Sequence, residues 1–197
     1  SEQDSFKLGF LRSKSLGTRW LQTRYVDYAY EDYTVSDQSS ISELIIFGTN
    51  WETATGRALS RATQGYRFSF DIRGASDNLG SDTSFARVRS LGEKTRFLAR
   101  TSLGITSKDD LSELPASVRF FAGGDNSVRG YDFESLGPTD STGAVIGGSH
   151  LIDVSLEIDR LFRDKWAVAV FVDGGDAFNN THIKLNTGVG IGLRWYS

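Results

Sequence analysis

Residues that commonly perform covalent chemistry are few in this sequence and are not arranged for it. No Gly-x-Ser-x-Gly segment is present, and His150 and His182 lie in separate segments with no obvious nucleophile as a partner. Cysteine is absent, which excludes thiolate metal sites and disulfide scaffolds. We therefore expect no enzyme activity and assign no catalytic residue.

Two glycine-containing patterns superficially suggest ligand binding. Gly188, Gly190 and Gly192 alternate with Val, Ile and Leu and no helix follows them, so small side chains on one face of a strand explain them better than a phosphate-binding loop. The run from Asp173 to Asp176 lacks the regular ligand spacing of a calcium loop. The sequence therefore predicts neither a cofactor nor a metal site.

The composition favours a single all-β domain. The 197 residues include 21 glycines but 2 prolines, together with 4 Trp, 7 Tyr and 13 Phe, a balance expected of many strands joined by tight turns. The longest apolar run, 166–172, is far shorter than the ~20 residues that a transmembrane helix needs. Basic and acidic residues are mixed along the chain with a formal net charge of -3, so no nucleic-acid partner is expected.

Alternation of apolar and polar residues with a period of two is the main structural signal. In the segment 66–73, for example, Tyr, Phe, Phe and Ile share one face while Arg, Ser, Asp and Arg share the other. Four further segments alternate clearly and four more do so weakly, which predicts nine antiparallel strands. The clear ones are 96–105, 150–159, 166–173 and 188–195, and the weaker ones lie at roughly 5–15, 20–32, 43–51 and 84–90.

Such alternation fits a soluble β-sandwich as well as a membrane barrel, because either can have one apolar face. The polar faces favour the barrel, since they carry charges in mid-strand beside small residues, as a water-filled lumen requires. A lysine or arginine facing lipid at the bilayer midplane would cost roughly 2–4 kcal/mol. The faces that carry Arg67 and Glu157 are therefore expected to point away from lipid, in a partial transmembrane β-barrel.

Connection lengths and tryptophans suggest how such a barrel would lie in its membrane. Short connections are expected near 16–19, 91–95 and 162–165, and longer ones at 33–42, 74–83, 107–149 and 174–187, whereas 52–65 does not fit the alternation. With the short connections on the periplasmic side, all four tryptophans fall at strand ends on one rim. They are predicted to form an interfacial girdle: Trp20, Trp51, Trp166 and Trp195.

The 107–149 connection is too long for an ordinary turn, and long connections without low complexity are usually functional. Its centre reads Ser-Val-Arg-Phe-Phe-Ala-Gly-Gly-Asp-Asn-Ser-Val-Arg-Gly-Tyr over 117–131. This sequence resembles the signature loop of the outer-membrane insertase and two-partner-secretion transporter superfamily, and within it the TamA-type barrels of translocation and assembly modules. The resemblance extends over most of 60–197.

The resemblance implies a specific contact. In that superfamily the loop folds back into the barrel lumen, and the arginine of its Val-Arg-Gly-aromatic tip pairs with acidic residues of the inner wall. The tip would be Val128, Arg129, Gly130 and Tyr131, and the wall partners would be Phe171, Asp173, Gly175 and Glu157. A guanidinium can bond a carboxylate through two parallel hydrogen bonds, and the small Gly130 is expected to let the loop backbone approach the wall closely.

The resemblance also implies a location, partners and a function. It places the chain in the bacterial outer membrane as part of a C-terminal barrel domain, with POTRA domains absent. The start Ser-Glu-Gln-Asp shows no signal peptide, so the chain is expected to be processed or a fragment. The expected partners are outer-membrane lipids, client β-barrel or autotransporter proteins, and a periplasmic or inner-membrane partner reached through the missing domains.

The function implied is that of an assembly or insertion factor for outer-membrane proteins or autotransporters, without cofactor. Three alternatives remain open: a two-partner-secretion pore for an unfolded client, the barrel anchor of a patatin-like phospholipase, and a soluble β-sandwich binding module.

Overall fold

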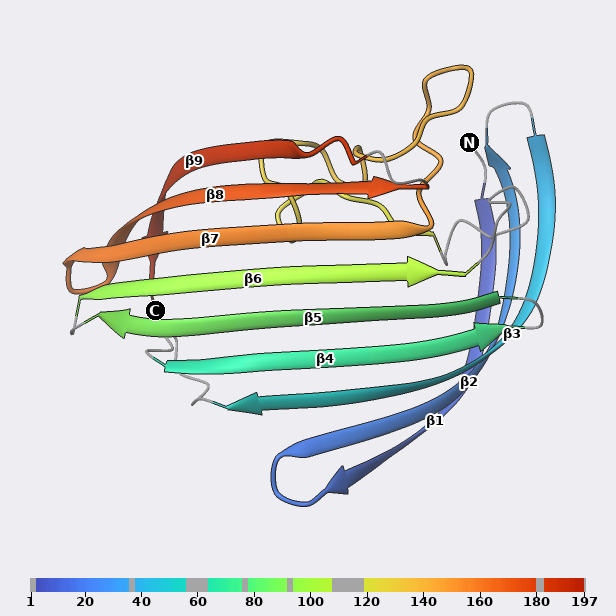
Figure 1. Ribbon diagram of the computed structural model, residues 1–197, viewed down its shortest axis with the longest axis horizontal. Coiled ribbons are helices and arrows are strands. Elements are labelled where there is room, and N and C mark those ends of the chain that lie inside the picture. Colours follow the sequence, from blue (N-terminus) through green and yellow to red (C-terminus); the bar gives the residue numbers. More distant parts are fainter. Residues whose placement is uncertain are drawn as a thin grey trace.

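The structure, a computed structural model, describes residues 3–35, 38–55, 64–75, 78–91, 94–107, 119–179 and 183–196. Within these residues nine strands form one sheet in the order β1 to β9, and every neighbouring pair is antiparallel. The sheet is strongly curved (Figure 1). The strands are β1 (Gln3–Leu16), β2 (Trp20–Val35), β3 (Gln38–Thr55), β4 (Gln64–Ala75), β5 (Asn78–Leu91), β6 (Thr95–Thr106), β7 (His150–Arg163), β8 (Trp166–Phe178) and β9 (Asn186–Trp195).

The predicted all-β antiparallel fold and the five clearly alternating segments are confirmed. Two of the predicted long connections, 33–42 and 74–83, are wrong, and a third, 174–187, is shorter than predicted because β8 continues to Phe178 and β9 begins at Asn186. Strand β2 continues to Val35 and β3 begins at Gln38, while β4 continues to Ala75 and β5 begins at Asn78. The described polar residues in these stretches lie in the antiparallel ladder, where cross-strand backbone pairing outweighs their weak strand propensity.

The two ends of the sheet therefore differ chiefly in one connection. The turns around Gly17–Arg19 and Asp164–Lys165 lie at one end, which is called the turn rim here (Figure 1, left). The 107–149 connection between β6 and β7 leaves from the opposite end, the loop rim.

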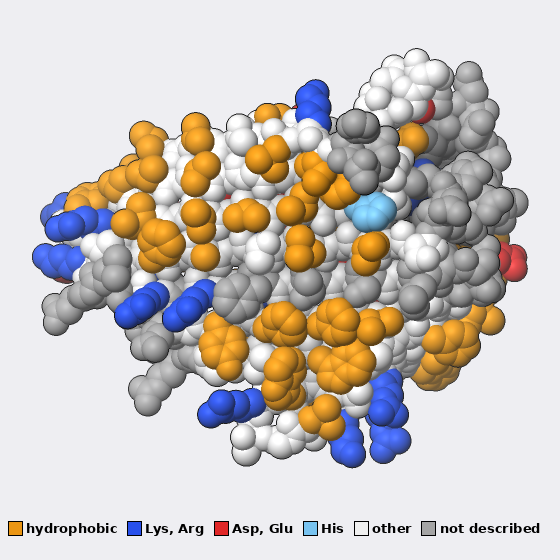
Figure 2. All heavy atoms as spheres, in the orientation of Figure 1, with side chains coloured by type: hydrophobic (Ala, Val, Ile, Leu, Met, Phe, Trp, Pro, Cys, Tyr) orange, Lys and Arg blue, Asp and Glu red, His pale blue; other side chains and the backbone are white. Residues whose placement is uncertain are grey.

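The face that residues 119–149 cover is called the inner face, and the opposite one the outer face. The outer face is apolar and exposed over β6 to β9, as Figure 2 shows. On β9, Val189, Ile191 and Leu193 are 78%, 82% and 68% exposed. Within the described residues no helix is long and apolar enough to cross a membrane.

The inner face carries the polar members of each alternation, because directly paired residues of neighbouring strands share a face. Ser155 pairs with Asp173, and Asp173 pairs with Gly188. Glu157 pairs with Phe171. Register alone therefore gathers carboxylates and glycines from three strands in one patch of the inner wall.

The outer face leads to a prediction about its surroundings. Val170 lies on β8 among exposed apolar neighbours. Val170→Lys should lower the free energy of unfolding in phospholipid vesicles by roughly 2–4 kcal/mol if the side chain lies near the bilayer midplane. Urea titration followed by tryptophan fluorescence measures this. The control Ile183→Lys, outside the strands, should change stability little, and equal losses from both substitutions would contradict a lipid-facing surface.

Candidate functional site

Residues 119–149 form a folded segment on the inner face. Backbone hydrogen bonds join Phe120 to Gly148 in both directions (2.8 and 2.7 Å) and Ala122 to Leu136 in both directions (3.0 and 2.9 Å). Its buried apolar side chains pack against the wall in one cluster. The cluster contains Phe120, Ala122, Val128, Leu136 and Ala177, with Leu151 partly buried against it. The segment is therefore held by its own pairing and by a small apolar core.

Val128 anchors the tip of this segment. Its side chain is fully buried. It lies against Gly175 of β8, where an added Cβ would come within 2.8 Å of Val128 Cγ2. Burial of a valine side chain contributes roughly 1.5–3 kcal/mol to stability. This contact therefore holds the following residue, Arg129, close to the wall.

Arg129 makes most of the polar contacts between the tip and the wall. Its Nε and Nη2 donate to the two carboxylate oxygens of Asp173 at 2.7 and 2.8 Å, which is a bidentate pair. Nη1 donates to Glu157 Oε2 at 2.6 Å, and Nη2 also donates to Ser155 Oγ at 3.1 Å. The Arg129 backbone amide adds a hydrogen bond to Asp173 Oδ2 at 3.1 Å.

The electrostatics of this contact are those of a buried ion pair. The side chains of Asp173 and Glu157 are 0% and 5% exposed, and that of Arg129 is 18% exposed. The guanidinium carbon also lies 3.6 Å from the centre of the Phe171 ring, a cation–π distance. The hydrogen bonds that Arg129 donates to Asp173, and secondarily the one it donates to Glu157, raise the pKa of Arg129 and keep it charged.

A second cation, which was not predicted from the sequence, neutralises the remaining negative charge of the site. Arg194 of β9 donates through Nη2 to Glu157 Oε2 at 2.8 Å, and the same nitrogen lies 2.6 Å from Oε1. Two arginines thus face two carboxylates. The place of Arg194 on the glycine face of β9 was visible in the alternation, but its pairing with Glu157 depends on the register of three strands. These residues, Arg129, Ser155, Glu157, Phe171, Asp173 and Arg194, are called the Arg129 site.

Close backbone approach occurs at Gly188, not at Gly130 as expected. A Cβ on Gly188 would collide with the Arg129 carbonyl oxygen, whereas a Cβ on Gly130 would meet nothing within 4 Å. Gly130 is instead required by its conformation, with φ at 92°, which favours glycine. The sequence predicts that the glycines of β9 share one face because small side chains are needed there, and at Gly188 the reason is that loop backbone occupies the space.

Tyr131 completes the tip. Its side chain is 37% exposed, and its carbonyl oxygen accepts a hydrogen bond from the Gly124 amide at 3.1 Å. Of the predicted tip residues, Val128 and Arg129 thus supply the side-chain contacts to the wall, and Gly130 and Tyr131 shape the turn.

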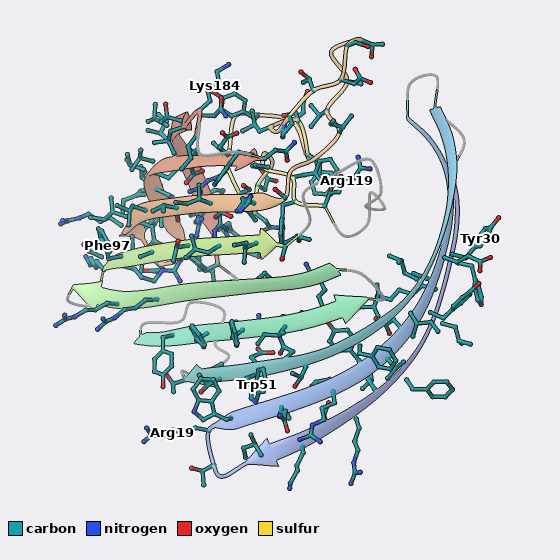
Figure 3. The ribbon with its side chains drawn as sticks, turned by 45° about the vertical axis from the view of Figure 1, so that its right-hand side comes forward. Arg19, Tyr30, Trp51, Phe97, Arg119 and Lys184 are labelled. Carbon is teal, nitrogen blue, oxygen red and sulfur yellow. The ribbon has the colours of Figure 1, made fainter. Side chains whose placement is uncertain are left out.

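A second contact fixes the other end of the segment. The guanidinium of Arg73, on β4, lies 5.8 Å from the centre of the Phe120 ring. Arg119 donates to the Ile146 carbonyl at 2.9 Å and so closes the base of the segment (Figure 3). Residues 119–149 therefore contact the wall from β4 to β9.

The four tryptophans lie toward the turn rim, away from the Arg129 site. Trp20 and Trp166 begin their strands, Trp195 ends β9, and Trp51 lies four residues before the end of β3. All four are on the outer face by register, and Trp166 pairs directly with Trp195. Figure 3 shows Trp51 and Arg19 near the same end of the sheet and Tyr30 at the other.

The residues considered for other chemistry do not join the site. His150 stacks on Phe178, with ring centres 5.3 Å apart, on the outer face. His182 lies outside the described residues. Asp176 accepts a hydrogen bond from the Lys184 amide at 2.8 Å. Among the described residues no group of three or more His, Asp or Glu is placed to hold a metal ion. The Arg129 site can hold a loop against the wall.

Comparisons with known proteins agree with this architecture. Residues 6–197 match the Omp85 superfamily domain. The chain is 28% identical over 134 residues to the outer membrane protein assembly factor BamA of Nitratidesulfovibrio vulgaris (strain Hildenborough), covering 64% of this chain and 17% of that protein. Its fold is similar to the crystal structure of BamA from Haemophilus ducreyi lacking POTRA domains 1–3, with a TM-score of 0.80, 16% identity and 99% of this chain covered. The chain spans 48% of that structure.

The close approach at Gly188 gives a test with a control on the same strand. Gly188→Ala should push the Arg129 carbonyl away from β9 and weaken the guanidinium contacts, so proteolysis within 119–149 should become faster. Gly192→Ala is the control, because a Cβ there would meet nothing within 4 Å. Limited proteolysis read by mass spectrometry measures the difference. Equal cleavage rates in the two variants would contradict the contact.

Proposed function

The chain belongs to the Omp85 superfamily, and from that membership we propose that it is part of the barrel of a factor that assembles or inserts outer-membrane proteins or autotransporters. It is an integral protein of the bacterial outer membrane and crosses it with β-strands. Residues 1–197 belong to the C-terminal barrel domain in this proposal, with the 107–149 loop directed into the lumen. No catalytic step and no cofactor are part of it.

The observation that carries the proposal is the Arg129 site. One residue of the loop bonds to Glu157 and Ser155 of β7 and to Asp173 of β8, and its carbonyl lies against Gly188 of β9. A loop that binds three consecutive strands holds that part of the wall in one register. The rest of the barrel can then change shape around a fixed section, as a factor that admits client strands requires.

Within the superfamily we assign the translocation and assembly module type. The 117–131 sequence and the aromatic-x-Asp-x-Gly pattern at Phe171–Gly175 support it. The relative from Nitratidesulfovibrio vulgaris is an outer membrane protein assembly factor, which supports insertion in preference to a secretion pore or a phospholipase anchor. Clients would be β-barrel or autotransporter proteins, and a periplasmic or inner-membrane partner would bind through domains beyond this chain.

Substitution of Arg129 tests the role of the loop. Removing one partner of a buried ion pair costs about 3–5 kcal/mol, because the remaining charge stays desolvated. In Arg129→Ala, amide hydrogen exchange within 119–149 should therefore be faster by about a hundredfold or more. Arg129→Lys keeps the charge but loses the bidentate geometry, so its effect should be intermediate.

Insertion of a client barrel protein into liposomes by the full-length protein should fall in the same order. The matched control is Arg19→Ala, in an exposed turn far from the loop. A loop that loosens while insertion stays unchanged would contradict the functional role. Unchanged exchange in Arg129→Ala would contradict the stabilising contact itself.

The four tryptophans form an interfacial girdle in this proposal. Their common position toward the turn rim and the partial exposure of Trp20, Trp166 and Trp195 (40%, 42% and 58%) support it. Aromatic side chains prefer the headgroup level of a bilayer. Lipids brominated at graded depths should therefore quench tryptophan fluorescence most strongly when the bromine is shallow. Strongest quenching by bromine at the bilayer centre would contradict the girdle.

A further inference from the structure

The outer face carries a set of cations near the turn rim. Each lies on a strand, within four residues of the end of that strand at the turn rim, and points outward by register. All seven are exposed. This set is called the outer basic band: Arg12, Lys14, Arg24, Arg87, Arg89, Arg160 and Arg163. In Figure 2, Lys and Arg side chains lie along the left and lower margins of the apolar surface.

The band has no acidic counterpart. Among the described outer-face positions the acidic ones all lie toward the loop rim: Asp4 and Asp32, which pair with each other near the loop-rim ends of β1 and β2, Glu43 in the loop-rim half of β3, and Asp176 near the loop-rim end of β8. Asp164 lies in the β7–β8 turn, beyond the strand ends. No member of the band forms an ion pair with a described carboxylate, whereas on the inner face Arg67 pairs with Glu52 at 2.7 Å. The outer band is therefore not the usual mixture of opposite charges.

The part of the band on β1 and β2 places like charges opposite each other. Arg12 of β1 pairs directly with Arg24 of β2, and Lys14 pairs with Gln22 one step nearer the turn on the same face. Like charges directly opposite in an antiparallel pair are destabilising. An anion bound between these side chains would remove the repulsion, and no described carboxylate supplies one.

The surroundings of this cluster define the kind of anion. Phe10 and Val26 flank Arg12 and Arg24 on the side of the sheet centre and are 78% and 40% exposed, while Leu16 and Trp20 flank them on the rim side. Four residues of strand span about 13 Å, or roughly 10 Å along the membrane normal for a tilted strand. The cations can thus lie over apolar surface and extend toward the headgroups.

We propose that the outer basic band binds the phosphate groups of anionic phospholipids, with Arg12, Lys14 and Arg24 as the principal site. A phospholipid supplies both features that the surface requires, because its phosphate meets the cations while its acyl chains cover Phe10 and Val26. The band orients the turn rim toward a leaflet that contains such lipids. This inference does not depend on the insertion activity proposed above.

Photocrosslinking at two matched positions tests the site. A benzophenone side chain replaces Gln22, beside the cluster, or Leu193, which lies equally close to the turn-rim end of β9 but outside the band. The full-length protein is reconstituted in equal parts of phosphatidylglycerol and phosphatidylcholine, and the lipid adducts are counted by mass spectrometry. The ratio of phosphatidylglycerol adducts to phosphatidylcholine adducts should be severalfold above one for the probe at position 22. For the probe at position 193 this ratio should be near one.

Charge variants show whether the cations cause the preference. Arg12→Gln should lower the ratio at position 22 by about fivefold, or to one if that is reached first, since a cation near an anionic surface contributes an affinity of that order. Lys184→Gln removes the same charge near the loop rim and should leave the ratio unchanged. Arg12→Glu should also abolish the preference, while its new carboxylate can pair with Arg24 and preserve the fold.

Each possible result of these measurements either supports or contradicts the phospholipid site. A ratio near one at position 22 in the unsubstituted protein would overturn the proposal, as would equal ratios at positions 22 and 193. A preference that survives Arg12→Glu in folded protein would overturn it as well. Loss of the preference in both Arg12 variants, with Lys184→Gln unchanged, would support it.

Discussion

The contact between the Arg129 guanidinium and the Asp173 carboxylate is the interaction on which this inner wall depends. Asp173 and Glu157 are buried, and two carboxylates without cations in such a place would carry a large desolvation penalty. Their cations come from a loop and from the last described strand. Wall and loop are therefore mutually dependent, because the wall pairs its charges through the loop and the loop is held through the wall.

Shape makes this pairing possible. Gly188 lets the loop backbone approach β9, and Gly175 leaves room for the Val128 side chain. The Arg129 guanidinium can therefore bind two carboxylates while the Arg129 carbonyl lies against a third strand. Neighbouring residues on the same strands point outward and take no part. Successive side chains of these strands thus point to opposite faces, so that inner-face residues contact the loop and outer-face residues are exposed to the surroundings.

The sequence predicted those features that depend on local pattern or on a complete motif. Period-two alternation gave the clear strands and their faces, and the motif residues Arg129, Asp173 and Glu157 meet in space. Strand ends rich in polar residues, such as 33–35 and 38–42, were missed because backbone pairing, which has no local signature, sets their extent. Arg194 was missed because its contact with Glu157 depends on the register of β7, β8 and β9, which no single segment encodes.

The two faces of the sheet satisfy their charges by different means. On the inner face a cation and a carboxylate from neighbouring strands meet directly, as Arg96 and Asp159 do at 2.5 Å with both side chains nearly buried. On the outer face Arg12 meets Arg24, and no described carboxylate is within reach. Internal pairing is required where the wall is covered by its own loop. Where the surroundings can supply phosphates, unpaired cations cost little, and their position along the strands then determines how deeply the sheet lies in the membrane.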